Sequence, residues 1–164
     1  MRTVIIGCGR TGAVLAETFE SLGHDVTVLD TNIRAFDRLP ATFRGSTVRG
    51  DGTDEDVLRR AGAADADLLL ALTEGDNRNI MAGQLATEVL GVKQVIIKIN
   101  DPVRADAYAA LGTATICRTN LMEDAILSFI GESARHLTGV RAPTGTHPGG
   151  EHHEIGAAAP GSEG

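Results

Sequence analysis

The feature that most constrains the fold is a glycine motif set between a short apolar run and a helical pattern. Val4, Ile5 and Ile6 lead into Gly7-Cys8-Gly9-Arg10-Thr11-Gly12, which has the G-x-G-x-x-G spacing. In a strand–turn–helix unit the first glycine permits a sharp turn and the second lets the backbone approach a pyrophosphate. The third lets the helix pack closely on the strand. The motif predicts a nucleotide-binding unit whose phosphates meet the positive end of a helix dipole, and the alternative is a purely structural turn.

An acid stands where such folds contact ribose. Asp30 ends a second strand, Asp25 to Asp30. Its carboxylate would accept hydrogen bonds from an adenosine ribose and would repel a 2′-phosphate. Because Thr31 and Asn32 supply no adjacent cation, we expect NAD(H) or an adenine nucleotide in preference to NADP(H).

The rest of the chain alternates apolar runs with helical patterns. The expected strands are Arg2–Ile6, Asp25–Asp30, Thr47–Gly50, Asp67–Leu72, Val95–Ile99 and Thr115–Cys117. The expected helices are Ala13–Leu22, Ile33–Leu39, Glu55–Ala61, Asp76–Leu90, Val103–Leu111 and one that starts near Asn120. This alternation and the right-handedness of crossover connections predict an α/β fold, a Rossmann-like, doubly wound, six-stranded parallel sheet in three αβα layers.

Composition narrows the class of partner. The formal net charge of −7 argues against a nucleic-acid scaffold and against direct attraction to anionic lipid. No apolar run approaches the length of a membrane span, and the N-terminus carries no secretory signal, so we expect a cytoplasmic protein with no direct membrane insertion. The two cysteines suggest no disulfide framework; Cys8 is either a small tolerated residue in the loop or a redox switch, which would require a lowered thiol pKa.

Three charged side chains have both a structural and a functional interpretation. Arg34 projects near the nucleotide edge and is either a solvated helix residue or a phosphate or ribose contact. Asp51 follows the third strand and is either an adenine-side ligand contact or an ordinary turn carboxylate. Lys98 lies in a predicted central strand, where a lysine must find an anion or extend out to solvent.

The C-terminal part divides into an apolar helix and a segment of different composition. The last helix carries one broad apolar stripe: Leu121, Met122, Ala125, Ile126, Phe129 and Ile130. The stripe is either part of the core or, as we prefer, a homodimer contact. From residue 139 onwards Gly, Pro, Ala, Ser and His dominate, so we expect a domain over residues 1–138 and a flexible tail over 139–164.

The chain lacks the groups that a dehydrogenase needs beside its cofactor. No Tyr-x-x-x-Lys pairing exists, and none of the histidines is well placed to act as an acid or base. The sequence thus predicts a binding module without an evident reaction.

These residues resemble a specific family, the N-terminal RCK domain of the TrkA and KtrA subunits of bacterial potassium uptake. The resemblance covers about Met1 to Gly131 and is carried by the glycine motif with Arg10, by Asp30, by Gly50-Asp51 and by Thr73 with Asn77. It implies a domain that binds NAD(H), ATP or ADP and is not an enzyme. It also implies a homodimer that assembles into a ring, with an octamer as one candidate size, on a membrane-embedded potassium transporter or channel. The protein would then be peripheral on the inner face of the plasma membrane through that partner.

The resemblance also implies roles for individual residues. Gly7, Cys8, Gly9, Arg10, Thr11 and Gly12 would hold the phosphates, and Asp30 with Thr31 would hold the ribose. Asp51 and Gly52 would border the adenine, and Thr73, Glu74 and Asn77 would line the far side. Lys98 stands where an arginine is expected, so a point charge replaces a bidentate fork. Glu123 matches an acid that in some relatives binds a divalent cation across a dimer interface, or is a solvated helix residue.

The resemblance also implies that relatives usually continue into a second domain, RCK-C. Where relatives carry it we expect the tail here, so that either another chain supplies RCK-C or the protein is a minimal regulator. The leading hypothesis is a nucleotide-sensing regulatory subunit, and the alternative is a fragment or subunit of an NAD-dependent oxidoreductase.

Overall fold

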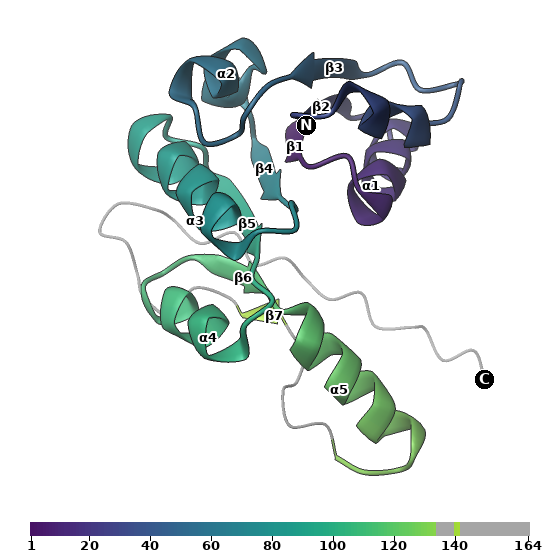
Figure 1. Cartoon of the computed structure of the whole chain (residues 1–164), viewed down its shortest axis with the longest axis vertical. Helices are drawn as coiled ribbons and strands as arrows, with labels where there is room; N and C mark the ends of the chain where they lie inside the picture. The colour runs from purple at the N-terminus through teal and green to yellow at the C-terminus, as the bar shows by residue number, and fades with distance from the viewer. Residues whose placement is uncertain (134–139, 142–164) are drawn as a thin grey trace, which may run out of the picture.

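In the computed structural model, residues 1–133 and 140–141 are described, and their strands form one sheet. The strands are β1 (Arg2–Ile6), β2 (Asp25–Asp30), β3 (Ser46–Arg49), β4 (Leu68–Ala71), β5 (Gln94–Lys98), β6 (Ala114–Ile116) and β7 (Val140–Arg141). Their order across the sheet is β3-β2-β1-β4-β5-β6-β7 (Figure 1). Strands β1 to β6 pair in parallel, so the predicted six-stranded parallel sheet is confirmed.

Both faces of the sheet are covered by helices, as the apolar runs require. Alternate residues of β1 point to opposite faces: Val4 and Ile6 belong to one buried cluster and Ile5 to the other. The first cluster includes Leu58, Ile80 and Ala105 from helices on one face. The second includes Ala13, Ala16 and Ala35 from the opposite face. Strand β4 is buried at all four positions, which is typical of a parallel strand between two helical layers.

The helices lie close to their predicted positions. They are α1 (Arg10–Ser21), the 3₁₀ helix η1 (Ile33–Arg38), α2 (Glu55–Arg60), the short η2 (Ala63–Asp65), α3 (Asp76–Gln84) with its π-helical continuation η3 (Leu85–Val89), α4 (Pro102–Ala110) and α5 (Arg118–Phe129). Helix α1 begins earlier than predicted, because the carbonyl oxygen of Gly9 already accepts a hydrogen bond from Ala13 N at 2.9 Å. Arg10 and Thr11 therefore belong to the first helical turn and not to the preceding loop.

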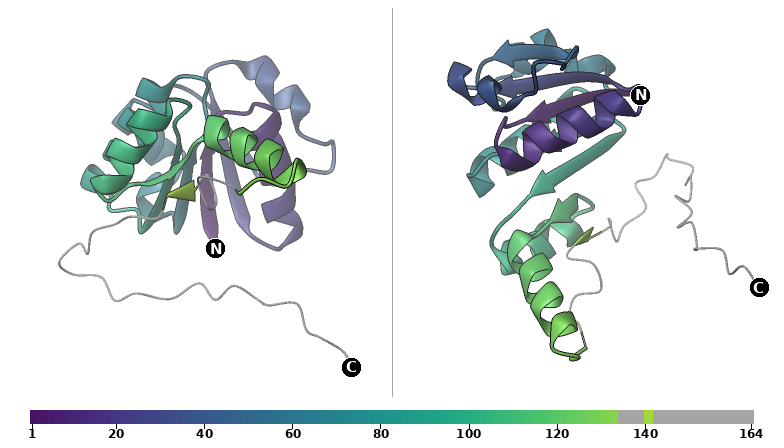
Figure 2. Two further views of the ribbon diagram at one scale, coloured as in Figure 1. Left: turned by 90° about the horizontal axis from the view of Figure 1, so that it is seen from below. Right: turned by 90° about the vertical axis from the view of Figure 1, so that its right-hand side faces the viewer.

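Helix α5 extends away from the sheet (Figure 1; right panel of Figure 2). Asn120 is its only buried residue among those described, whereas Phe129 is 91% exposed. The apolar stripe predicted from the sequence is therefore open on this chain, and Leu121, Met122, Ile126 and Ile130 are exposed with Phe129.

A seventh strand, which the sequence did not predict, follows the parallel set. Val140 and Arg141 pair antiparallel with β6, opposite Ile116 and Thr115. Apart from these two residues, the predicted tail at 139–164 lies outside the described residues. Among the helices that the structure describes, none is both long and apolar enough to cross a bilayer.

Candidate functional site

A cleft of about 460 Å³ opens at the carboxyl ends of β1, β2, β3 and β4. Strand order reverses between β1 and β4, and ligands of open α/β sheets bind in the crevice at such a switch point. Most residues predicted to contact a ligand line this cleft: Gly7, Cys8, Gly9, Arg10, Asp30, Thr31, Asp51, Gly52, Thr73 and Glu74. The exceptions are Thr11, Gly12, Asn77 and Lys98.

The three glycines of the motif meet different surroundings. Gly7 has φ +102°, and a Cβ there would lie 3.0 Å from Thr73 N. A Cβ at Gly12 would overlap the carbonyl oxygen of Gly7, so the close approach of α1 to the turn requires a glycine. Gly9 has no atom within 4 Å of an added Cβ. Since Gly9 also lines the cleft, its missing side chain leaves open space at the N-terminus of α1, where an anion is favoured.

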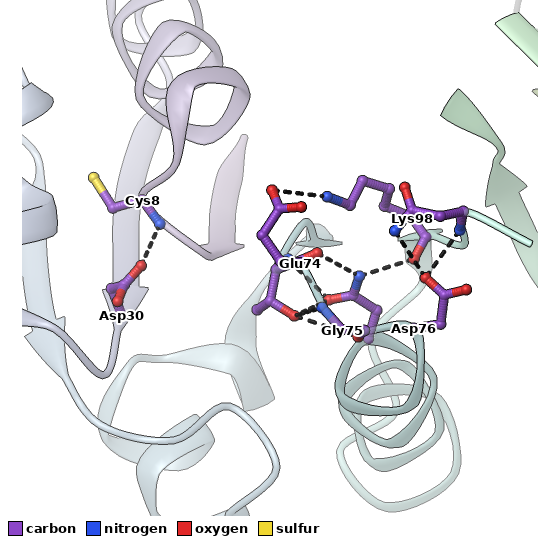
Figure 3. A network of polar contacts seen from close by, with 9 residues as sticks. Cys8, Asp30, Glu74, Gly75, Asp76 and Lys98 are labelled. Atoms are coloured by element: carbon purple, nitrogen blue, oxygen red, sulfur yellow. Dashed lines mark hydrogen bonds and ion pairs between the residues drawn. The ribbon is translucent and has the colours of Figure 1, made fainter. Parts of the chain in front are cut away.

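Asp30 is fixed by the loop that it faces. One carboxylate oxygen accepts a hydrogen bond from Cys8 N at 2.8 Å (Figure 3). The other accepts one from Asn32 N at 2.8 Å. Each carboxylate oxygen has two lone pairs, so the group keeps acceptor capacity for ligand hydroxyls.

Asp51 lines the cleft and also stabilises its own turn. Its Oδ1 accepts hydrogen bonds from Thr53 N at 3.0 Å and from Thr53 Oγ1 at 2.9 Å. These bonds hold the pKa of Asp51 below its ordinary value, and the nearby Arg78 cation adds to the effect. The two interpretations of Asp51 are therefore compatible: the turn keeps the carboxylate ionised while it faces the cleft.

The thiol of Cys8 is fully buried. Burial raises the pKa of this thiol, the Asp30 carboxylate raises it further, and Arg38 opposes them. A redox switch needs a thiolate near neutral pH, so the geometry favours the interpretation of Cys8 as a small residue tolerated in the loop. Both Cys8 and Cys117 are free and buried.

The ends of β4 and β5 are joined by Asn79, a residue that the sequence analysis did not single out. Asn79 is fully buried, and its amide donates to Thr73 O at 3.0 Å and to Lys98 O at 2.8 Å. Its Oδ1 accepts from Thr73 N at 2.9 Å and from Thr73 Oγ1 at 2.7 Å. Asn77, which the resemblance indicated, is exposed and accepts a hydrogen bond from Arg104 Nη2 at 2.7 Å.

Lys98 finds its anion in Glu74. The ammonium nitrogen lies 3.4 Å from Glu74 Oε1, which accounts for a lysine in this strand (Figure 3). Behind this pair, Asp76 accepts hydrogen bonds from Asn100 N at 2.9 Å and from Asp101 N at 3.2 Å, and so holds the loop after β5.

The cleft lining includes two arginines that the sequence did not indicate. Arg38 reaches it from the end of η1, whereas Arg34, the residue singled out in that helix, is not part of the lining. Arg78 reaches the cleft from the first turns of α3. A cation thus shares the cleft with Asp30 after all, so discrimination against a 2′-phosphate rests on the Asp30 carboxylate itself.

Glu123 lies on α5 and is half-buried, away from the cleft lining. Within residues 1–133 and 140–141, no three His, Cys, Asp or Glu side chains group as a metal site would require.

Comparisons with known proteins find a matching family. A family model described as the TrkA-N domain matches residues 3–119. The Trk system potassium uptake protein TrkA of Streptomyces coelicolor is 42% identical over 127 residues, which are 77% of this chain and 57% of that protein. The TrkA homolog of Pyrococcus abyssi is 36% identical over 102 residues, which are 62% of this chain and 45% of that protein. The chain therefore spans about half the length of these curated relatives.

Solved structures share the fold. The TrkA-N domain of the inner membrane protein ybaL from Escherichia coli matches with a TM-score of 0.70 and 15% identity, over 79% of this chain and 96% of that one. The structure of GsuK bound to ADP matches with a TM-score of 0.64 and 20% identity, over 78% of this chain and 34% of that one.

Proposed function

Since the chain belongs to the TrkA-N domain family, we propose that it is a nucleotide-binding regulatory module of a potassium uptake system and not an enzyme. The observation that carries the proposal is that one cleft holds both open space at Gly9 and, beside it, the oriented carboxylate of Asp30. An adenine nucleotide needs these two elements, a phosphate cradle and a ribose acceptor. The ligand is NAD(H) or ATP/ADP.

The ligand would lie across the switch point of the sheet. Its phosphates would rest on the glycine motif from Gly7 to Gly12, with Arg10 beside them, and its ribose on Asp30. Asp51 and Gly52 would border the adenine, and Thr73 with Glu74 would line the far end. Support comes from the cleft lining, which includes all of these residues except Thr11 and Gly12, and, for one fold neighbour, from the ADP bound to GsuK.

Regulation requires that nucleotide binding changes the affinity for a partner. The partner proposed is a membrane-embedded potassium transporter or channel, as the names of the TrkA relatives suggest, and the domain would act at the cytoplasmic face through that partner. A ligand can shift such an assembly only by binding two of its arrangements with different affinity. A ring of homodimers, with an octamer as one candidate size, would supply the two arrangements.

A titration with NADH and with ATP tests the proposal. Either nucleotide should raise the melting temperature by about 5 °C or more at roughly 100 times its Kd, because it binds only the folded state. NADH absorbance should stay constant in the presence of candidate substrates. Specific turnover would favour the oxidoreductase alternative, and no melting shift with any adenine nucleotide would refute nucleotide binding.

The open stripe of α5 supports a homodimer. Replacing Ile126 by glutamate should convert a dimer into a monomer, because a charge in the buried centre of an apolar interface is costly. Ile126 is 59% exposed on the single chain, so the variant should still fold, and its melting curve should stay cooperative. Analytical ultracentrifugation measures the mass.

Val103→Glu is the matched control for this test, since Val103 is an apolar residue of α4 that is 78% exposed and lies outside the stripe. It should leave the dimer intact. A wild-type protein that is monomeric at high concentration would contradict the homodimer and, with it, a cation shared between two copies of Glu123.

A further inference from the structure

The two side chains of the Glu74–Lys98 ion pair differ strongly in solvent exposure. The Lys98 side chain is 12% exposed, whereas the Glu74 side chain is 84% exposed. Glu74 lines the cleft and Lys98 does not. A ligand in the cleft would therefore meet the carboxylate first and the ammonium group only behind it (Figure 3).

Glu74 also differs from the other acids of the cleft. Asp30 and Asp51 each accept hydrogen bonds from backbone N–H groups, which partly balance their charge. In the described part of the chain, Lys98 is the sole hydrogen-bonding or ion-pair partner of Glu74. The far end of the cleft thus presents an exposed carboxylate in front of the buried ammonium group that pairs with it.

We infer that Glu74 determines which adenine nucleotide the cleft prefers. It disfavours a ligand whose distal end is anionic, such as the terminal phosphate of ATP, relative to one whose distal end is uncharged, such as the nicotinamide of NADH. The inference rests on the proposed nucleotide-binding function and deepens it, because it assigns the dinucleotide as the preferred class. Lys98 could then bind a phosphate only if the phosphate displaced the Glu74 carboxylate.

The physical reason is the position of the two charges. With the adenosine end at Asp30 and Asp51 and the phosphates on the glycine loop, the distal group points across the switch point towards β4, where Glu74 follows Thr73. Like charges brought together in a partly desolvated cleft repel more strongly than in bulk water. An anion that replaced the Glu74 carboxylate would lie within reach of Lys98, whose ammonium nitrogen is now 3.4 Å from Oε1.

Calorimetric titrations of ATP and NADH in magnesium-free buffer test the inference. For Glu74→Gln, the ratio of the ATP Kd to the NADH Kd should fall by roughly fivefold or more, because one repulsive charge is removed and Lys98 is released. When Glu74→Gln is introduced into a Lys98→Met variant, the ratio should fall by less, because that variant has no ammonium group for Glu74→Gln to release. Glu55→Gln is the matched control: Glu55 lies outside the cleft lining, its side chain is 43% exposed and it pairs with Arg59 at 2.7 Å on α2, so its removal alters net charge equally without changing the ratio.

The outcomes separate this inference from the proposed function. If the wild-type protein binds both nucleotides and Glu74→Gln leaves the ratio unchanged or raises it, the role of Glu74 is refuted and nucleotide binding stands. If the wild-type protein binds neither nucleotide, both fail. Melting curves of each unliganded variant verify folding, which the exposed, nearly isosteric glutamine should preserve.

Discussion

Replacing Gly12 by alanine should destabilise the protein by about 3 kcal/mol, because the new methyl group has no room. Its Cβ would overlap the carbonyl oxygen of Gly7, and a backbone atom cannot move aside as the end of a flexible side chain can. Relief would require α1 to shift away from β1, which would also distort the phosphate cradle. Urea unfolding measures the loss, and nucleotide titration should find binding abolished.

Gly9→Ala is the matched control, since it adds the same methyl group at another glycine of the same motif. A Cβ at Gly9 meets nothing within 4 Å, so stability should change by less than about 1 kcal/mol. The methyl group would occupy the open space at the cradle, and the nucleotide Kd should rise by roughly tenfold or more. Equal stability losses for the two variants would contradict the distinct tasks assigned to these glycines.

Asn79→Ala should be the second large effect, with a loss of about 3–5 kcal/mol. The substitution removes four hydrogen bonds and leaves Thr73 N, Thr73 O and Lys98 O without the partner that joins β4 to β5. Each buried polar group left unsatisfied costs about 1–3 kcal/mol. Urea unfolding again provides the measurement.

Asn77→Ala is the control for this prediction, because Asn77 lies on the same helix but is exposed. Its hydrogen bond with Arg104 lies at the surface, and the change should cost less than about 0.5 kcal/mol. If Asn77→Ala lowered the free energy of unfolding as much as Asn79→Ala, the conclusion that Asn79 holds the ends of β4 and β5 together would be wrong.

The sheet was predictable because its signals are local. The apolar runs of β1 and β4, the glycine motif and the acid at the end of β2 each lie within a few residues of chain, and together they indicate the parallel order. Strand β7 was not predictable in this way. Its two residues carry no periodic pattern, and they form a strand only through pairing with β6, which lies well before them in the chain.

The candidate site was predictable where a residue follows a strand end and not where it lies on a helix. Asp30 and Asp51 could be placed in the cleft because parallel strands bring their carboxyl ends to one edge. The choices between Asn77 and Asn79, and between Arg34 and Arg38, depend on the rotation of a short helix about its axis. That rotation is set by packing against strands distant in sequence, such as the bond from Asn79 to Lys98 O.

A crystal structure of the protein with NADH bound would test the proposed nucleotide site most directly. We expect ligand phosphates on the backbone N–H groups at the start of α1, from Gly9 onwards, and adenosine ribose hydroxyls within hydrogen-bond distance of Asp30. A nucleotide bound outside this cleft, or one whose ribose makes no contact with Asp30, would contradict the proposal.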